Sequence, residues 1–438
     1  MFSETLKRIV EIMGPSHASS YFGALIFLKW LFKKRPGFVK MLGLEQFSIL
    51  SSARNGNLDV DLQDIFARIE RFESNEYAGL FSWINFSDLR PAYSGSRLHY
   101  IGEIVSAVEE SDLDEPAMLA QVLLFVESTS VETPTSIAEL ISALVACRAG
   151  EKILDPVSGS ASLILSCADQ AAKITALERN RSMWFFAKLN TMMSGHSSTH
   201  VYNADCFSDV PGVPDKFDVV IGNPPWGIRL DSWHGAIRAF DELPFKPTAK
   251  SLLDYAFVLE MIRRMDPVRG RVAVLVSNGM LTRSGFEEQI RRSLIEQNLL
   301  DAVIALPEKM FANTAIGASI LLFKASRISN DILFLDARPH ATQSRGQNSF
   351  SNDAVDTIAS IVQSPESSDG PFRLVSISEV AEQNFTISVP RYVNTAPSSE
   401  HLSIESMLER KATLKVEVDQ LSDRIDVLVN ELRSRMLL

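Results

Sequence analysis

The stretch KILDPVSGSASLIL, residues 152–165, joins a short apolar run to a helix-like segment through Asp155 and a row of small residues. A strand that ends in an acidic residue and turns through glycine into a helix lets backbone N–H groups approach a polar ligand, although many such loops bind none. Six further apolar runs follow it, at residues 174–178, 200–205, 217–222, 271–277, 301–306 and 319–325. The runs are continuous rather than alternating, and helical segments separate most of them. The sequence therefore predicts an α/β fold with a doubly wound, mostly parallel, seven-stranded sheet.

Length and composition limit the kinds of protein that this chain can be. At 438 residues it is too long for one ordinary domain. Its three cysteines form no CxxC pair, which argues against a disulfide framework or a zinc site and fits a reducing cytoplasm. The most apolar N-terminal stretch, residues 21–32, is shorter than the about 20 residues that a membrane span needs, and no signal peptide opens the chain. We therefore expect a cytoplasmic protein that does not enter a membrane.

Changes of pattern divide the chain into four regions. Residues 1–126 have helical periodicity and predict an all-helical N-terminal domain. Residues 127–335 carry the strand-like runs, and residues 336–398 are interpreted as a linker and C-terminal extension because 340–371 is rich in Ser, Asn, Gln and Gly. In residues 399–438, apolar side chains recur at alternating steps of three and four, which is typical of a coiled-coil helix. A helix packed on its own domain is the alternative.

Acidic residues end the first three strand-like runs. Asp155 ends the first, Glu178 the second and Asp205 the third. Because the carboxyl ends of parallel strands meet at one edge of a sheet, these groups would line one nucleoside pocket. Glu178 has the spacing of an acid that holds ribose hydroxyls, and Asp205 could accept a hydrogen bond from the amine of an adenine ring. Each residue taken alone could instead be a helix cap or a solvated turn residue.

The fourth run ends in Asn223-Pro224-Pro225-Trp226. The side-chain carbonyl of Asn223 and the backbone carbonyl of Pro224 can accept hydrogen bonds from a planar amine whose lone pair is delocalised into a ring. Consecutive prolines fix φ near about −65° and so hold that carbonyl in place. Trp226 offers a flat face on which an extruded base can stack. The motif therefore predicts group transfer to a planar nitrogen.

NPPW following DPVSGSA (155–161) resembles the signature of S-adenosylmethionine-dependent amino-methyltransferases. The whole chain is similar to the modification (M) subunit of type I restriction-modification systems, a DNA adenine-N6 methyltransferase. The further segments that carry this resemblance are LIFLKWLF (25–32), ETPTSIAELISALV (132–145), LLDYAFVLEMI (252–262), GRVAVLVSNGMLTRSG (270–285), LPEKMFANTAIGASILLFK (306–324) and NFTISVPRYV (384–393). They follow in family order, so the resemblance covers most of residues 20–435.

The resemblance implies a Rossmann-like core that binds S-adenosylmethionine and methylates adenine N6 in DNA after base flipping. The cofactor-binding residues would be Thr133, Asp155, Pro156, Gly159, Ser160, Glu178 and Asp205, and the target base would be held by Asn223, Pro224, Pro225 and Trp226. Thr133 would touch the methionine end of the cofactor. No metal is implied, and His196 and His200 lack a carboxylate at metal-ligand spacing.

Two positions depart from the family pattern. The family usually has Cys-Gly-Thr-Gly-Gly in the cofactor loop, whereas this chain has SGSAS at residues 158–162. If Ala161 must adopt a positive φ, its Cβ costs roughly 1 kcal/mol. Glu132 replaces the aromatic residue that usually precedes Thr-Pro. Weaker cofactor binding is therefore an open alternative, and so is a catalytically degenerate assembly scaffold.

The segment after NPPW is long and contains four basic residues that are candidates for contacts with DNA phosphates: Arg229, Arg238, Lys246 and Lys250. The net charge of −11 disfavours DNA binding unless a basic face or a basic partner exists. The resemblance implies a specificity subunit, a restriction subunit and two M subunits per complex, assembled through residues 400–438. Release-factor-type protein glutamine-N5 methyltransferases and RNA methyltransferases share the NPP-aromatic motif and stay open as alternatives.

Overall fold

The computed structural model describes residues 2–72, 76–86, 96–126, 133–167, 173–196, 199–233, 237–241, 243–311, 316–342, 347–394 and Lys415. The chain divides into two compact units, Met1–Val393 and Asn394–Leu438. The predicted heptad helix belongs to the second unit and, apart from Lys415, lies outside the described residues, as does Glu132. Among the described helices, none combines the length and the apolar character needed to cross a membrane.

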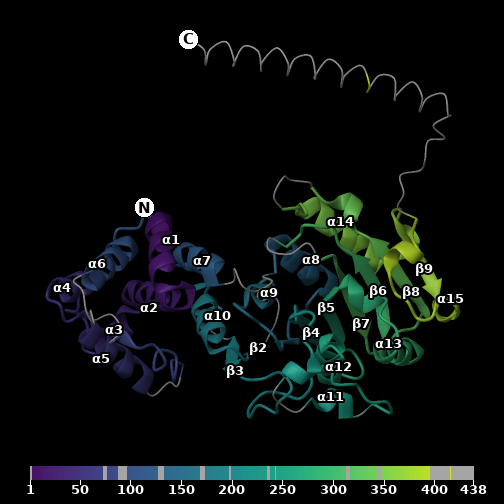
Figure 1. Cartoon of the computed structure of the whole chain (residues 1–438), viewed down its shortest axis with the longest axis horizontal. Helices are drawn as coiled ribbons and strands as arrows, with labels where there is room; N and C mark the ends of the chain where they lie inside the picture. Colours follow the sequence, from purple (N-terminus) through teal and green to yellow (C-terminus); the bar gives the residue numbers. More distant parts are fainter. Residues whose placement is uncertain are drawn as a thin grey trace, which may run out of the picture. The chain divides into compact units, whose positions relative to one another are not determined.

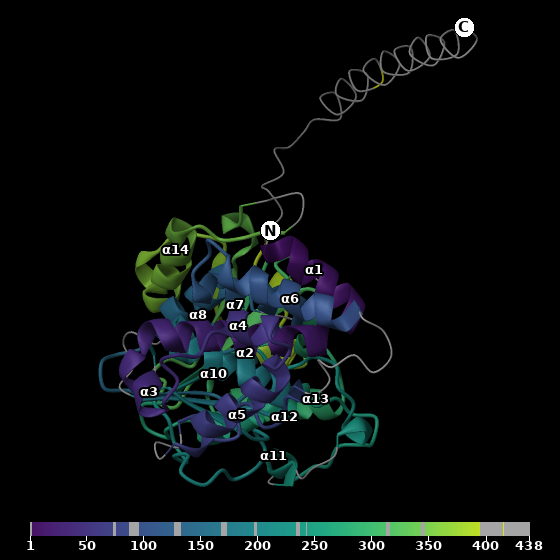
Figure 2. The same ribbon diagram turned by 90° about the vertical axis from the view of Figure 1, so that its left-hand side faces the viewer.

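The described part of residues 1–126 contains helices and the turns that connect them, and no strand. The helices are α1 (Phe2–Met13), α2 (Pro15–Lys34), α3 (Pro36–Met41), α4 (Ile49–Arg54), α5 (Leu58–Arg71), α6 (Ser96–Glu109) and α7 (Glu115–Val126). Helix α2 packs against α1, α6 and α7 and reaches α10 (Arg181–Met193) of the sheet region (Figures 1 and 2). A Cβ on Gly23 would lie 2.9 Å from Phe185 and 3.0 Å from Phe186. Glycine at this position therefore lets α2 pack closely on α10.

The described residues form a nine-stranded sheet of order β3-β2-β1-β4-β5-β7-β6-β8-β9. Its strands are β1 (Lys152–Asp155), β2 (Lys173–Glu178), β3 (His200–Asn203), β4 (Val219–Gly222), β5 (Arg271–Ser277), β6 (Leu300–Ala305), β7 (Ala318–Lys324), β8 (Asp331–Asp336) and β9 (Phe372–Ser376). Strands β1 to β5 run parallel, whereas β7 lies antiparallel between β5 and β6 and β9 lies antiparallel to β8. The strand order reverses between β1 and β4, which creates a crevice at their carboxyl ends.

The expected count of seven strands is wrong, although the seven expected runs coincide with β1 to β7. Strand β8 is a further buried run, DILFLD, that begins shortly after β7 ends. Strand β9, FRLVS, has two exposed residues and one buried residue and lies in the region interpreted as a linker. Helix α14 (Asn352–Gln363) lies in the same region and packs on α8 (Thr135–Val145), burying Ile358 completely. Residues up to Val393 therefore belong to the unit that contains the sheet.

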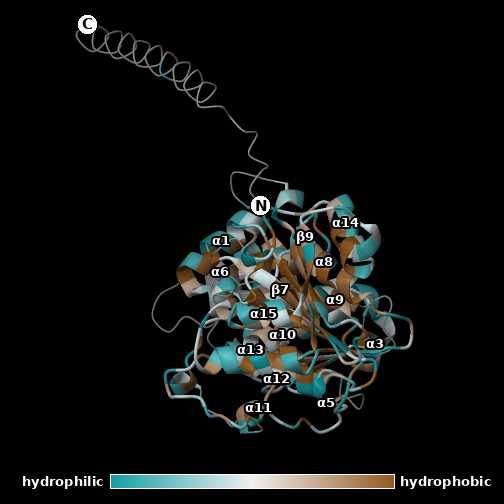
Figure 3. Cartoon of the chain, turned by 90° about the vertical axis from the view of Figure 1, so that its right-hand side faces the viewer, coloured by the Kyte–Doolittle hydropathy of each residue, from teal (hydrophilic) through white to brown (hydrophobic). Residues whose placement is uncertain are grey.

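Helices cover both faces of the sheet, as expected for a doubly wound fold. Val219 and Ile221 of β4 join the core formed with α8, α10 and α14, whereas Val220 joins the core formed with α12 (Asp254–Arg264) and α13 (Phe286–Glu296). Three further short helices belong to this part of the chain: α9 (Ser162–Leu165), α11 (Arg238–Asp241) and α15 (Ile377–Glu382). Figure 3 shows hydrophobic residues gathered in the strands and hydrophilic ones on the outer side of helices such as α13. Each fully buried aliphatic side chain contributes about 1.5–3 kcal/mol, so both layers hold the strand ends in place.

Candidate active site

A cavity of about 780 Å³ lies at the carboxyl ends of β1, β2 and β4. It is lined by every residue that the sequence assigned to the cofactor or the target base: Thr133, Asp155, Pro156, Gly159, Ser160, Glu178, Asp205, Asn223, Pro224, Pro225 and Trp226. Its volume is within the range of about 300–1,000 Å³ that is common for small-molecule sites. The structure therefore brings these residues together at the crevice where the strand order reverses.

Carboxylates hold the loop that follows β1. The backbone N–H of Val157 donates to Asp155 Oδ1 at 3.0 Å, and that of Gly159 donates to Glu178 Oε2 at 3.0 Å. The N–H of Asn180 donates to the other oxygen of Glu178 at 2.6 Å. Glu178 therefore fixes both the loop that follows β1 and the start of α10, and this arrangement follows from its place at the end of β2.

Ala161 has a left-handed backbone, with φ 67° and ψ 12°, directly before α9. This is a conformation in which glycine is favoured, because an L-residue places its Cβ too close to the following carbonyl oxygen. The side chain is completely buried. Position 161 therefore does require the positive φ at which the family has glycine, and the chain meets it with a buried methyl group.

Burial is the main influence on the pKa of two groups, Asp155 and Glu178, in the carboxylate wall that they form with Asp205. It raises the pKa of Asp155 to about 7, with a smaller increase from the neighbouring Glu178 carboxylate and an opposing effect from the Val157 N–H. Burial also raises the pKa of Glu178, against the N–H groups that bond to it. A ligand that carries positive charge or donates hydrogen bonds would favour the ionised form of both groups.

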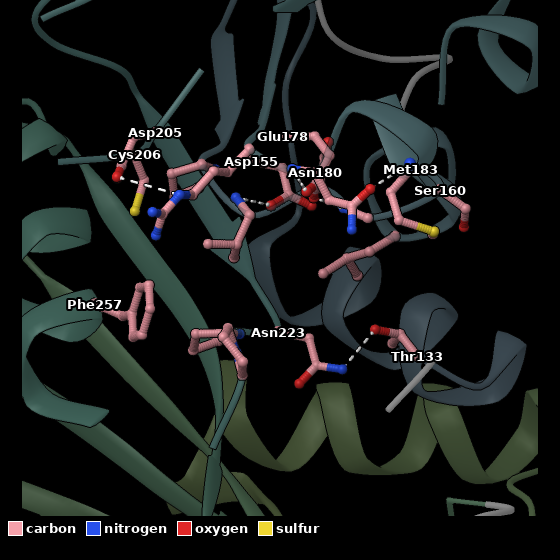
Figure 4. A pocket seen from close by; sticks show the side chains of 18 of the residues that line it. Thr133, Asp155, Ser160, Glu178, Asn180, Met183, Asp205, Cys206, Asn223 and Phe257 are labelled. Carbon is pink, nitrogen blue, oxygen red and sulfur yellow. Dashed lines mark hydrogen bonds and ion pairs between the residues drawn. The ribbon is translucent and has the colours of Figure 1, made fainter. Parts of the chain in front are cut away.

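The NPPW segment forms the opposite wall. Figure 4 shows Asn223 and Thr133 across the cavity from the three carboxylates. Asn223 Nδ2 donates to Thr133 Oγ1 at 3.0 Å, so the amide is oriented with Oδ1 as its acceptor end. The Trp226 indole N–H donates to the Leu275 carbonyl at 3.4 Å. The Trp226 ring packs in a T-shaped arrangement with Phe311, with the ring centroids 5.4 Å apart and the planes at 86°.

The pocket also contains residues that the sequence did not assign, among them Arg179, Asn180, Met183, Cys206, Trp233 and Phe257. The Arg179 guanidinium lies 4.1 Å from the ring centroid of Trp233, and its Nε is 3.8 Å from Asp205 Oδ2. Arg179 directly follows the Glu178 strand end, so its position could have been inferred from the sequence. Trp233 and Phe257 come from segments beyond NPPW, and only the tertiary fold places them here.

None of the four basic residues proposed for DNA contacts lines the cavity: Arg229, Arg238, Lys246 and Lys250. Two of them form exposed ion pairs, Arg229 with Asp231 and Arg238 with Asp209, both at 2.5 Å. Exposed pairs of this kind are weak in water, so a phosphate group can replace the carboxylate. In the part of the chain that the structure describes, no group of three or more His, Cys, Asp or Glu side chains is arranged to hold a metal ion.

The family model of N-6 DNA methylases matches residues 127–401. The chain belongs to the N-6 DNA methylase family. It is 24% identical over 442 residues to the type I restriction enzyme MpnII methylase subunit of Mycoplasma pneumoniae, covering 87% of this chain and 80% of that protein. It is 27% identical over 358 residues to the HindI methylase subunit of Haemophilus influenzae, covering 76% and 79%. The solved type I methyltransferase subunit from Streptococcus thermophilus shares the fold of this N-6 DNA methylase, with a TM-score of 0.71 and 21% identity over 90% of this chain and 99% of that one.

These matches confirm the resemblance to type I modification subunits that the motifs predicted. They also confirm the enzyme class, a DNA adenine-N6 methyltransferase.

Proposed function

We propose that the cavity binds S-adenosylmethionine along its carboxylate wall and a flipped target adenine against NPPW. We further propose that the chain works in the cytoplasm as the modification subunit of a type I complex. The observation that carries the proposal is the shared cavity: Asp155, Glu178 and Asp205 lie on one wall and Asn223 lies on the other. A donor and an acceptor of a methyl group can therefore meet inside it.

The wall residues fit a nucleoside that carries a cationic tail. Asp155 and Glu178 offer carboxylate oxygens to ammonium and hydroxyl groups, and Phe257 and Trp233 offer flat apolar surfaces to a purine. When bound, the cofactor supplies an electrophilic methyl group. We assign the loop residues Pro156, Gly159 and Ser160 to the same ligand and Thr133 to its methionine end.

The chain's own residues orient the amine that accepts the methyl group. Asn223 Oδ1 and the Pro224 carbonyl accept hydrogen bonds from the two N6–H groups and so direct the nitrogen lone pair out of the plane of the ring. Trp226, which packs in a T-shaped arrangement with Phe311, provides the surface on which the base stacks. Stacking of a base on an aromatic side chain contributes about 1–3 kcal/mol, which offsets part of the cost of extruding it from the duplex.

Sequence recognition comes from a partner in this proposal. The relatives named above are themselves subunits of restriction enzymes. We assign residues 400–438 to a helix that packs with a specificity subunit, in a complex with two modification subunits and a restriction subunit. This arrangement accounts for a chain of net charge −11 that acts on DNA, because the partner supplies basic surface beside Arg229, Arg238, Lys246 and Lys250.

A labelled-methyl transfer assay tests the proposal. The full chain, co-purified with its specificity subunit, is incubated with labelled S-adenosylmethionine and DNA, RNA or release-factor protein. We expect label on adenine of DNA, and we expect Asn223→Ala to lower the rate about 100- to 1,000-fold because an oriented hydrogen-bonding group is lost. Asn57→Ala, an exposed asparagine before α5, is the matched control and should leave the rate unchanged.

Two outcomes would contradict the proposal. Label on RNA or on protein in place of DNA would assign the pocket to one of the alternative substrates. Cofactor binding measured by calorimetry without transfer to any substrate would show a degenerate, assembly-only protein.

A further inference from the structure

Asp254, the first residue of α12, is buried behind the NPPW segment with 3% of its surface exposed. Its Oδ1 accepts a hydrogen bond from the backbone N–H of Gly227 at 2.8 Å. Its Oδ2 accepts from two nitrogens of Arg283, at 2.9 and 3.0 Å. A single carboxylate therefore joins the residue after Trp226 to a guanidinium group.

Arg283 in turn connects this carboxylate to two other elements. It donates to Glu287 Oε1 in the first turn of α13 at 2.7 Å and to the hydroxyl of Ser277, the last residue of β5, at 3.4 Å. Charge-assisted hydrogen bonds are short and strong, and two of them converge on Oδ2, so Arg283 sets the orientation of Asp254. The Gly227 N–H is therefore bonded to a carboxylate that cannot easily turn away.

The two prolines explain why this bond matters. Pro224 and Pro225 have no backbone N–H, so hydrogen-bond donors from the main chain cannot anchor the middle of the segment. Asn223 is held at one end by Thr133, and at the other end Gly227, with φ 72°, is held by Asp254. Trp226 lies directly before this second anchor.

We propose that Asp254, oriented by Arg283, is a positioning residue that sets the place of Trp226 and of the Pro224 carbonyl in the cavity. Asp254 does not line the cavity and acts through the Gly227 N–H. This inference rests on the proposed function, because what it positions is the surface that receives the target base. Displacing reacting groups by about 1 Å can cost on the order of 100-fold in rate, so a single backbone bond of this kind matters to turnover.

Glu287 offers a matched control for Asp254. Both carboxylates are buried, with 6% and 3% of their surfaces exposed, and both accept from Arg283. Only Asp254 also bonds to Gly227. Asp254→Asn and Glu287→Gln therefore remove the same charge beside the same guanidinium, but only the first weakens the anchor. The asparagine has one acceptor oxygen and cannot serve Gly227 and Arg283 together.

The test follows Trp226 directly, in full-length chain labelled with 5-fluorotryptophan and studied by fluorine NMR. Trp226→Phe assigns the resonance. We expect Asp254→Asn to shift or broaden the Trp226 signal, and Glu287→Gln to leave it in place while lowering Tm by a similar amount. In the methyl-transfer assay, Asp254→Asn should lower kcat about 10- to 100-fold with an unchanged KM for S-adenosylmethionine, and Glu287→Gln should change kcat less than about twofold.

An unchanged Trp226 signal in Asp254→Asn, or an equal shift in both variants, would overturn the inference. Arg283→Lys provides a second variant if Asp254→Asn does not fold: it keeps the charge, loses the two-pronged contact and should shift the same signal less. The resonance does not depend on turnover. If the wild-type chain failed to methylate DNA but the Trp226 resonance shifted in the variants as expected, the proposed function would be rejected. The positioning role of Asp254 would still be supported.

Discussion

The two walls of the cavity are held by hydrogen bonds that differ in sequence separation. The carboxylate wall is called the cofactor wall and the NPPW segment the target wall, after the ligands proposed for them. On the cofactor wall, loop N–H groups bond to carboxylates only 2 and 19 residues away in the sequence. On the target wall, the contacts of NPPW and of the glycine after it span 90, 49 and 27 residues, to Thr133, Leu275 and Asp254. The first wall is the product of neighbouring βα units, whereas the second depends on three separate parts of the fold. Cofactor binding and target positioning should therefore be separable by mutation.

Replacing one tryptophan on each wall tests whether cofactor binding and target positioning can be changed separately. Trp226→Ala removes the proposed stacking surface and should lower turnover about 10- to 100-fold with an unchanged Kd for the cofactor. Trp233→Ala removes the ring beneath Arg179 and should raise that Kd about 10-fold. Calorimetry with S-adenosylmethionine and the labelled-methyl assay measure the two quantities. If each variant changed both Kd and turnover, the two walls would act as one unit, and cofactor binding and target positioning would not be separable.

The cofactor wall should also respond to pH in a way that the target wall does not. The pKa of Asp155 is about 7 in the ligand-free pocket, and a cationic ligand favours the carboxylate. The affinity of the pocket for the cationic cofactor should therefore rise about tenfold per pH unit as the pH increases towards 7. Above pH 7 the affinity should level off. The stability of the ligand-free chain should change in the opposite direction. Because the folded pKa lies above the unfolded value, Asp155 binds more protons when folded, and stability falls as pH rises from about 4 to 7.

Asp155→Asn isolates this titration from that of Glu178, whose pKa burial also raises. The variant should bind the cofactor more weakly at pH 8 and with a much flatter pH dependence between 5.5 and 8. Calorimetry at four pH values is sufficient. A wild-type affinity that stays constant across this range would show that Asp155 does not change its protonation when the ligand binds.

Features that depend on neighbouring residues in the sequence could be predicted, whereas contacts between distant segments could not. Strands β1 to β7 were found because each is a continuous apolar run, and the three carboxylates because each ends its run. Strand β9 was missed because two of its five residues, Arg373 and Leu374, are exposed, so its composition resembles a loop. The sequence of this segment alone does not show that it can pair with β8 at the edge of the sheet.

The target wall shows a second limit. The NPPW motif is visible in the sequence, but the residues that hold it in place are not. No local pattern links Gly227 to Asp254 or Trp226 to Phe311. The segment LLDYAFVLEMI (252–262) was found through the family resemblance, but the resemblance does not show what the carboxylate of Asp254 contacts. Hydrogen bonds over such separations are products of packing, and they become visible only when the strands are placed in order.

Replacing Ala161 by glycine should change stability only slightly, because two opposing contributions act at this position of the cofactor wall. Ala146, the residue after α8, is the matched control, because it also has a left-handed backbone, with φ 43°. Ala146 is exposed, so Ala146→Gly should relieve strain alone and raise the free energy of unfolding by about 1 kcal/mol. Ala161 is fully buried, so Ala161→Gly relieves similar strain but loses a buried methyl group of about 0.8 kcal/mol.

The two contributions at Ala161 nearly cancel, so Ala161→Gly should change the free energy of unfolding by less than about 0.5 kcal/mol. Denaturant unfolding of the two glycine variants beside wild type measures the difference between them. Equal stabilisation by both would mean that the Ala161 methyl group packs poorly, and that the departure from the family glycine does cost the cofactor loop stability. A neutral Ala161→Gly beside a stabilising Ala146→Gly would show how this chain tolerates alanine there: burial of the methyl group offsets the strain of the backbone on which the pocket is built.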